Sequence, residues 1–160
     1  MSQTLEYTAL SDQALIDLLF TEADRLPRAA ADEIIRRGVP LAPALVRILD
    51  DEELWTTDSS RWWAIVHATY LLAAMQPPGA LETLIRTLER ADRHDVDWIT
   101  NDARHLLSAF GPTAVPLLRS AALDGKLAPY VRVYIVKKIL LRRLLAQGEG
   151  RFFATSVIHG

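Results

Sequence analysis

Apolar residues recur every three to four positions along most of the chain, which is the spacing of one face of an α-helix. A first helix is predicted over residues 11–26, with Ser11 or Asp12 able to cap its start. A second helix is predicted from Pro27 to Gly38 and a third from Pro43, because proline favours helix starts and glycine favours helix ends. The acidic stretch DDEELWTTDSS, residues 50–60, is predicted to be a loop.

Two segments far apart in the chain share one pattern. RGVPLAPALVRILDD covers residues 37–51, and FGPTAVPLLRSAALD covers residues 110–124. Each has a glycine in second place, a proline inside a short Ala/Val/Leu run, and an acid at the end. A glycine that ends one helix and a proline that opens the next are expected between the two helices of an αα-hairpin.

The preceding helices also repeat. Residues 61–75 align with residues 96–110 at an offset of 35, and one stripe stays apolar in both: Ala64, Ala68, Leu71 and Met75 match Ile99, Ala103, Leu106 and Phe110. Neighbouring columns change freely, for example from Thr69 to Arg104, so these columns are expected to face solvent. In the second helices, Leu45 and Leu49 align with Leu84 and Leu88, then with Leu118 and Ala122.

The repeats predict an all-α fold, a short right-handed α-solenoid of antiparallel helix pairs about 35 residues long. We expect a single domain over residues 1–160. It would comprise an N-terminal helix (11–26), repeats at about 27–51, 61–92 and 97–124, and a C-terminal capping helix (129–146) followed by a tail.

The Gly-x-x-Ala-Val-Pro-x-Leu pattern of residues 111–118, together with the Leu/Ala-rich first helices, resembles HEAT repeats. More narrowly, it is similar to the bacterial HEAT-like repeats first described in phycobilisome lyases, and the likeness covers roughly residues 27–146. The middle pair has Glu82 in place of the proline, and the first pair lacks the tryptophan column formed by Trp63 and Trp98. The resemblance implies the repeat architecture, and the bilin chemistry of the lyases is not carried over.

Composition narrows the class of protein. The chain has no cysteine, its first ten residues lack a signal-peptide pattern, and its longest nearly apolar run, residues 62–75, is too short to span a bilayer. A cytoplasmic protein with no membrane partner is therefore expected. The acidic groups at residues 50–58 and 92–97 lack the spacing of a metal site, and no catalytic motif is present, so we expect no metal, no cofactor and no catalysis.

The charge is divided unevenly along the chain. Residues 1–125 hold 11 Lys and Arg against 19 Asp and Glu, a net −8, whereas residues 126–160 hold 7 against 1, a net +6. The basic arc, defined as Arg132, Lys138, Arg142 and Arg143, is predicted to contact an acidic surface on a protein partner or on a second copy of the chain. Arg47, Arg86 and Arg119 hold similar places in the second helices and are further candidates, on the concave side of the stack.

The tryptophan column carries the alternative hypothesis. Trp98 is followed four positions later by Asp102, as Trp63 is by His67. This arrangement is similar to that of HEAT-like DNA glycosylases, which place aromatic residues and an aspartate on the concave face. Packing between repeats is the favoured interpretation of the column, and the acidic first 125 residues argue against a nucleic-acid partner. The sequence thus favours a protein-binding scaffold without catalytic activity, with a glycosylase-type repair enzyme as the alternative.

Overall fold

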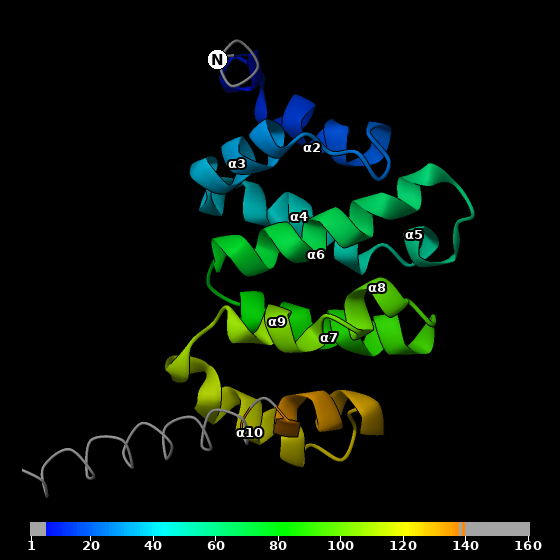
Figure 1. Ribbon diagram of the computed structural model, residues 1–160, viewed down its shortest axis with the longest axis vertical. Coiled ribbons are helices and arrows are strands. Elements are labelled where there is room, and N and C mark those ends of the chain that lie inside the picture. Colours follow the sequence, from blue (N-terminus) through cyan, green and yellow to red (C-terminus); the bar gives the residue numbers. More distant parts are fainter. Residues whose placement is uncertain (1–5, 138, 140–160) are drawn as a thin grey trace, which may run out of the picture. The chain divides into compact units, whose positions relative to one another are not determined.

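The computed structural model describes residues 6–137 and residue 139 (Figure 1). Every regular element among them is a helix, which confirms the all-α prediction. The chain divides into two compact units, one ending at Phe110 and the other beginning at Gly111, and each is described by itself. The single domain over residues 1–160 stays a prediction. No helix in the described part of the chain is long and apolar enough to cross a membrane.

The first unit contains ten of the labelled elements. They are α2 (Asp12–Thr21), α3 (Arg28–Arg37), η1 (Val39–Leu41), α4 (Ala42–Asp50), α5 (Glu52–Thr56), η2 (Ser60–Trp62), α6 (Trp63–Met75), α7 (Ala80–Arg93), α8 (Asp97–Thr100) and α9 (Ala103–Ser108). Within this unit α2 and α3 lie at one end, α4 and α6 in the middle, and α7, α8 and α9 at the other end (Figure 1). The second unit contains η3 (Pro112–Ala114), α10 (Val115–Leu123) and a helix that begins at residue 129.

Local chemistry explains where the first helices begin and end. Ser11 is the cap of α2, since its Oγ accepts a hydrogen bond from the amide of Ala14 at 3.1 Å. The helix ends at Thr21, earlier than the predicted residue 26, and Ala23 has a left-handed φ of 48° that no continuous helix allows. Helix α3 begins after Pro27 and ends at Arg37, with Gly38 as the residue that follows it, in agreement with the predicted start and stop.

The repeated segments have the same backbone course. Gly38 and Gly111 have φ values of 70° and 64°, which a side chain would strain, and each precedes a 3₁₀ turn that leads into an α-helix. Asp51 and Asp124 follow those helices, and the Oδ1 of each accepts the amide two residues on, at 3.0 Å from Glu53 and 2.9 Å from Lys126. The likeness between the two sequence segments therefore extends to glycine conformation, turn and closing aspartate.

Helix α6 is the centre of the first unit. It packs against α2, α3 and α4 and also against α7, α8 and α9. Of the eight stripe positions, Met75 and Phe110 are half-buried and the others are buried. The prediction that the Thr69 column faces solvent is wrong at Thr69, which is 0% exposed because α6 is enclosed on several sides, whereas Arg104 in the same column is exposed. Its hydroxyl donates to the carbonyl of Ile65 at 2.8 Å, which satisfies the buried group.

Two further expectations are corrected. The helix expected over residues 96–110 is broken into α8 and α9 by a turn at Asn101 and Asp102. The acidic stretch expected to be a loop contains the short helix α5, in which Trp55 is buried. Asp51 caps α5, and the first-turn acids Glu52 and Glu53 suit the positive end of its dipole.

An arginine ties α7 to the end of α4. The Nη1 of Arg90 donates to the carbonyl of Leu49 and to Oδ1 of Asp50, both at 2.7 Å, while its Nε donates to Oε1 of Glu52 at 2.9 Å. The same Leu49 carbonyl accepts the indole N–H of Trp55 at 3.0 Å. Two of these contacts therefore satisfy the Leu49 carbonyl, which lies at the end of α4, where carbonyls lack helical partners.

A second network surrounds Glu33 on α3. Its carboxylate accepts two hydrogen bonds from Arg36, both at 2.7 Å, and one from Arg37 at 2.8 Å. The hydrogen bonds from Arg36 and then Arg37 lower the pKa of Glu33 to about 2. Arg37 also donates to Asp12 at 2.6 Å and to the carbonyl of Leu10 at 2.7 Å, so the network joins α3 to the start of α2.

Candidate functional site

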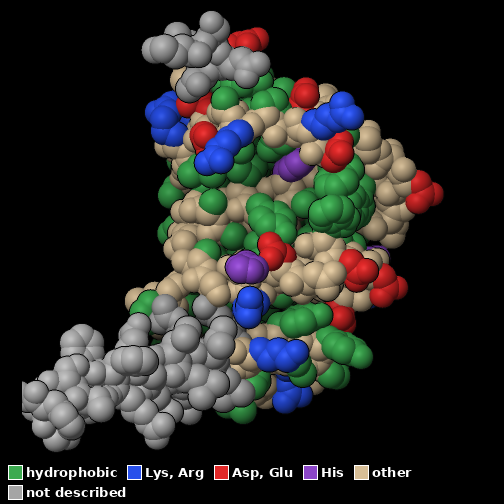
Figure 2. All heavy atoms as spheres, viewed as in Figure 1, with side chains coloured by type: hydrophobic (Ala, Val, Ile, Leu, Met, Phe, Trp, Pro, Cys, Tyr) green, Lys and Arg blue, Asp and Glu red, His purple; other side chains and the backbone are tan. Residues whose placement is uncertain are grey.

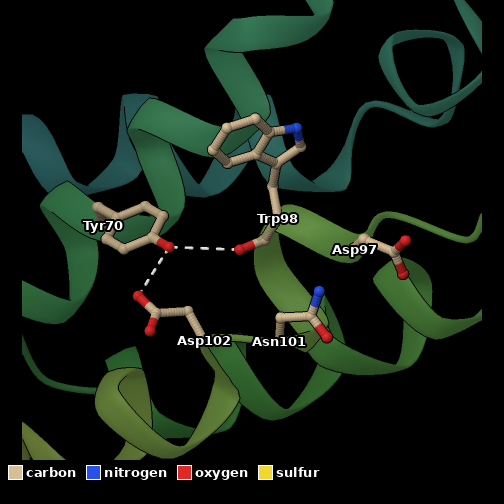
Figure 3. Close-up of a pocket in the computed structure, with 5 residues that line it drawn as sticks. All are labelled: Tyr70, Asp97, Trp98, Asn101 and Asp102. Carbon is tan, nitrogen blue, oxygen red and sulfur yellow. Dashed lines mark hydrogen bonds between the residues drawn. The ribbon is translucent and has the colours of Figure 1, made fainter.

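A pocket of about 450 Å³ opens between α6 and α8. Tyr70 comes from α6, Asp97 and Trp98 come from α8, and Asn101 and Asp102 come from the turn that separates α8 from α9 (Figure 3). The break in the helix therefore helps to form the pocket, because two of its lining residues lie in that turn. The volume is within the range of roughly 300–1,000 Å³ typical of small-ligand sites.

The two tryptophans of the column lie in contact but differ in burial. Their rings are 5.5 Å apart in an edge arrangement, and Trp63 is also 5.3 Å from Trp62 and 6.3 Å from His67. Trp63 is partly buried, consistent with the packing interpretation. Trp98 is 62% exposed, so packing alone does not describe it. An exposed tryptophan beside a pocket is typical of a binding surface.

Tyr70 and Asp102 point toward one another across the pocket (Figure 3). The Tyr70 hydroxyl donates to Oδ2 of Asp102 at 2.8 Å and lies 3.3 Å from the carbonyl oxygen of Trp98. Burial, followed by the hydrogen bond to Asp102, raises the pKa of Tyr70, so the phenol stays protonated and acts as a donor. This bond fixes the carboxylate of Asp102 at the edge of the pocket.

Sequence reasoning did not single out Tyr70 or Asn101. A signal for Tyr70 was present, because Trp63, His67 and Tyr70 follow the spacing i, i+4, i+7 and so share one face of α6. His67 lies on that face in a structural role, with its Nε2 2.6 Å from the carbonyl oxygen of Ala23. Asn101 had no such signal, because its place in the pocket depends on the break between α8 and α9.

The predicted arginine ladder is divided between the two units. Arg47 on α4 and Arg86 on α7 are exposed side chains of the first unit, and Arg86 reaches the hydroxyl of Thr83 at 3.2 Å. Arg119 on α10 is exposed in the second unit. A common groove lined by all three arginines stays a prediction.

Only one member of the basic arc belongs to the described residues. Arg132 is partly buried, and its Nε donates to the carbonyl of Ala122 near the end of α10 at 2.9 Å. This contact gives a structural reason for a positive charge in the first turns of the following helix, since cations favour the C-terminal end of a helix dipole. Lys138, Arg142 and Arg143 lie outside the described residues.

Polar side chains also gather away from this pocket. Within residues 6–137 and 139, no group of three or more His, Asp or Glu side chains is placed to hold a metal ion. His94 stacks on Trp55 with ring centroids 5.8 Å apart, and its Nε2 is 3.9 Å from a Glu52 carboxylate oxygen.

The fold and the pocket define a class: an all-helical protein with an open pocket of aromatic, amide and carboxylate groups. Comparison with protein families, with curated proteins and with solved structures gave no significant match. Function therefore has to be inferred from the site.

Proposed function

We propose that the chain is a protein-binding module, built from HEAT-like helix pairs stacked as a short α-solenoid and without catalytic activity of its own. The position of α6 supports the repeat architecture, because α6 packs against α3 of the preceding pair and against α7, α8 and α9. The matched glycine, 3₁₀ turn and closing aspartate of segments 37–51 and 110–124 support it independently. Stacked helix pairs expose extended surfaces that commonly bind other proteins.

The exposure of Trp98 is the observation that carries the proposal. Its 62% exposed side chain lies on the edge of a pocket, next to the partly buried Trp63. Exposing a large aromatic surface to water is unfavourable, and tryptophan and tyrosine are enriched among residues that dominate binding energy at protein interfaces. A protein partner that covers Trp98 would bury that surface.

The basic C-terminal end and the concave face are the second part of the proposal. The net charge of +6 over residues 126–160 favours an acidic surface on the partner, and Arg47, Arg86 and Arg119 supply further exposed positive charge. The same charge division allows a head-to-tail contact between two copies, since the first 125 residues carry −8.

The experiment is capture of partners from a lysate of the native cell, followed by direct binding measurements with the purified partner. Trp98→Ala is compared with Val39→Ala, a control that shortens another exposed apolar side chain of the first unit, 58% exposed and outside the basic C-terminal end. Lys138→Glu with Arg142→Glu tests the basic end. We expect Trp98→Ala and the charge reversal each to weaken binding while Val39→Ala does not. Equal binding by wild type and by both test variants would refute the proposal.

A glycosylase-type repair enzyme is the second candidate, because Trp98 and Asp102 do line one pocket. The discriminating measurement is fluorescence anisotropy with labelled duplex DNA at low salt, together with an assay for release of damaged bases. The enzyme hypothesis expects clear affinity that decreases with added salt, and base release that requires Asp102. The binding-module proposal expects neither.

A further inference from the structure

The pocket beside Trp98 combines an exposed aromatic ring with two carboxylates. Asp97 is exposed and Asp102 is half-buried, and the five lining residues include no positively charged side chain. On this face of the first unit, acidic side chains adjoin a cluster of hydrophobic ones (Figure 2). The face of an indole ring and a carboxylate both attract cations. The composition of the pocket therefore favours a positively charged ligand over a neutral or anionic one.

The carboxylate of Asp102 can accept a further hydrogen bond. Tyr70 donates to its Oδ2 at 2.8 Å, whereas its Oδ1 accepts no hydrogen bond from any residue that the structure describes. An ionised carboxylate has about four acceptor positions on its two oxygens, so a second, charged donor can be added without displacing the tyrosine. The Tyr70 hydroxyl is neutral and orients the carboxylate, which reduces the cost of ordering it when a ligand binds.

The shape of the site distinguishes among cations. A guanidinium is planar, so it can stack on an indole face and still direct N–H groups in its own plane toward a carboxylate or an amide oxygen. The Asp102 carboxylate and the Asn101 amide supply such acceptors. An ammonium group lacks a planar face and binds as a compact, strongly hydrated charge. The volume of about 450 Å³ accommodates a guanidinium with part of its methylene stem.

We propose that the pocket between α6 and α8 binds the side chain of an arginine on the surface of a protein partner. This inference rests on the proposed function, because it specifies what part of the partner the Trp98 surface recognises. Trp98 supplies the stacking face, Asp102 and Asp97 supply the opposite charge, and Tyr70 positions Asp102.

The test uses the full chain labelled with ¹⁵N and a capped peptide with a single arginine between glycines. The matched control peptide carries citrulline, which has nearly the same shape without the charge, and a third peptide carries lysine. The probe is the indole N–H resonance of Trp98, assigned with Trp98→Phe. We expect a saturable shift with the arginine peptide and at least about tenfold weaker binding of the citrulline peptide, since loss of a charge-assisted contact removes about that factor. The lysine peptide is expected to bind between these two.

Variants of the chain provide the second arm. Asp102→Asn and the exposed Asp97→Asn should each weaken binding of the arginine peptide several-fold, whereas Asp124→Asn, a control carboxylate in the second unit, should leave it unchanged. Retention of the dispersed wild-type amide spectrum in both pocket variants shows that the unit is folded. Citrulline binding as tight as arginine binding, or no shift of the Trp98 resonance, would overturn the inference.

Two outcomes separate this inference from the proposed function. If a captured partner binds through Trp98 but all its arginines can be replaced by citrulline or lysine without loss, the binding-module proposal stands and the arginine pocket is refuted. If the arginine peptide binds as expected but the chain has no protein partner, the pocket is supported and the binding-module proposal fails. A change in the sedimentation of the free chain on Trp98→Ala would show that a second copy occupies the pocket, which overturns the assignment to a separate partner.

Discussion

Replacing Arg90 by methionine tests whether the contacts between α7 and the end of α4 stabilise the first unit. Methionine keeps an aliphatic stem but removes three hydrogen bonds, to the Leu49 carbonyl, to Asp50 and to Glu52. The Arg90 side chain is only 20% exposed, whereas the side chains of Asp50 and Glu52 are 44% and 57% exposed, so solvent screens both ion pairs. In the variant, the Leu49 carbonyl still accepts the hydrogen bond from the Trp55 indole N–H. This limits the loss of unfolding free energy caused by removing the bond from Arg90.

These contacts give the expected magnitude. The charged bond to the carbonyl contributes about 1.5 kcal/mol, and the two exposed ion pairs contribute roughly 0.5 kcal/mol each. We therefore expect Arg90→Met to lower the free energy of unfolding by about 2–3 kcal/mol. In a urea titration followed by circular dichroism, a slope of about 2 kcal/mol/M converts this loss into a midpoint lower by about 1 M or slightly more.

The control lies one turn earlier on the same helix. Arg86 is exposed and has one hydrogen bond, to Thr83, so Arg86→Met should cost no more than about 0.5 kcal/mol. A double-mutant cycle of Arg90→Met with Glu52→Gln should give a coupling of about 0.5 kcal/mol. If Arg90→Met proves no more costly than Arg86→Met, the contacts to α4 do not stabilise the unit and the reasoning fails.

Three other predictions concern burial and charge. Leu118 is 1% exposed, so Leu118→Ala should lower the free energy of unfolding by about 2–5 kcal/mol. Leu123 on the same helix is 82% exposed, so Leu123→Ala should lower it by about 0.5 kcal/mol or less. Similar urea midpoints for the two variants would contradict the assigned face of α10. Thr69→Val keeps the buried shape and loses one hydrogen bond, so it should lower the free energy of unfolding by about 1 kcal/mol or less. Thr69→Ala should lower it further, because this variant also leaves a cavity. The opposite order in urea melts would count against tight packing around Thr69. Because the folded pKa of Glu33, about 2, is below its ordinary value of 4.5, its contribution to stability is complete above about pH 4.5 and is lost as pH falls through about 2. The difference in unfolding free energy between wild type and Glu33→Gln should shrink over that range, and a constant difference would mean that the carboxylate is not held by Arg36 and Arg37.

Helical periodicity predicted the buried stripe of α6 but not how many sides of that helix are enclosed. Ala64, Ala68 and Leu71 are buried as expected, since a helix must bury its apolar face. Thr69 is buried as well, because neighbours cover α6 from both the preceding and the following helices. A single sequence shows which residues can be buried, while the number of packing partners depends on the tertiary arrangement.

In the pocket too, the local sequence pattern predicted some residues, and others depend on tertiary contacts. The spacing of Trp98 and Asp102 indicated a shared helix face, and both residues do line one pocket. The hydrogen bond from Tyr70 joins residues 32 positions apart and requires α6 and α8 to be adjacent, which no local pattern contains. The break at Asn101 was missed because the apolar stripe continues across it without interruption.

The chain takes a different structure after the aspartate that closes each of the two repeated segments. The Oδ1 atoms of Asp51 and Asp124 complete the same two-residue turn, yet the chain continues into helix α5 after the first and into a short turn before residue 129 after the second. Because the aspartate's own side chain closes the turn through the amide two residues on, the turn requires no contact with residues further along the chain. We therefore expect that a loop or a short helix can be inserted or exchanged after this aspartate while the preceding helix pair keeps its structure.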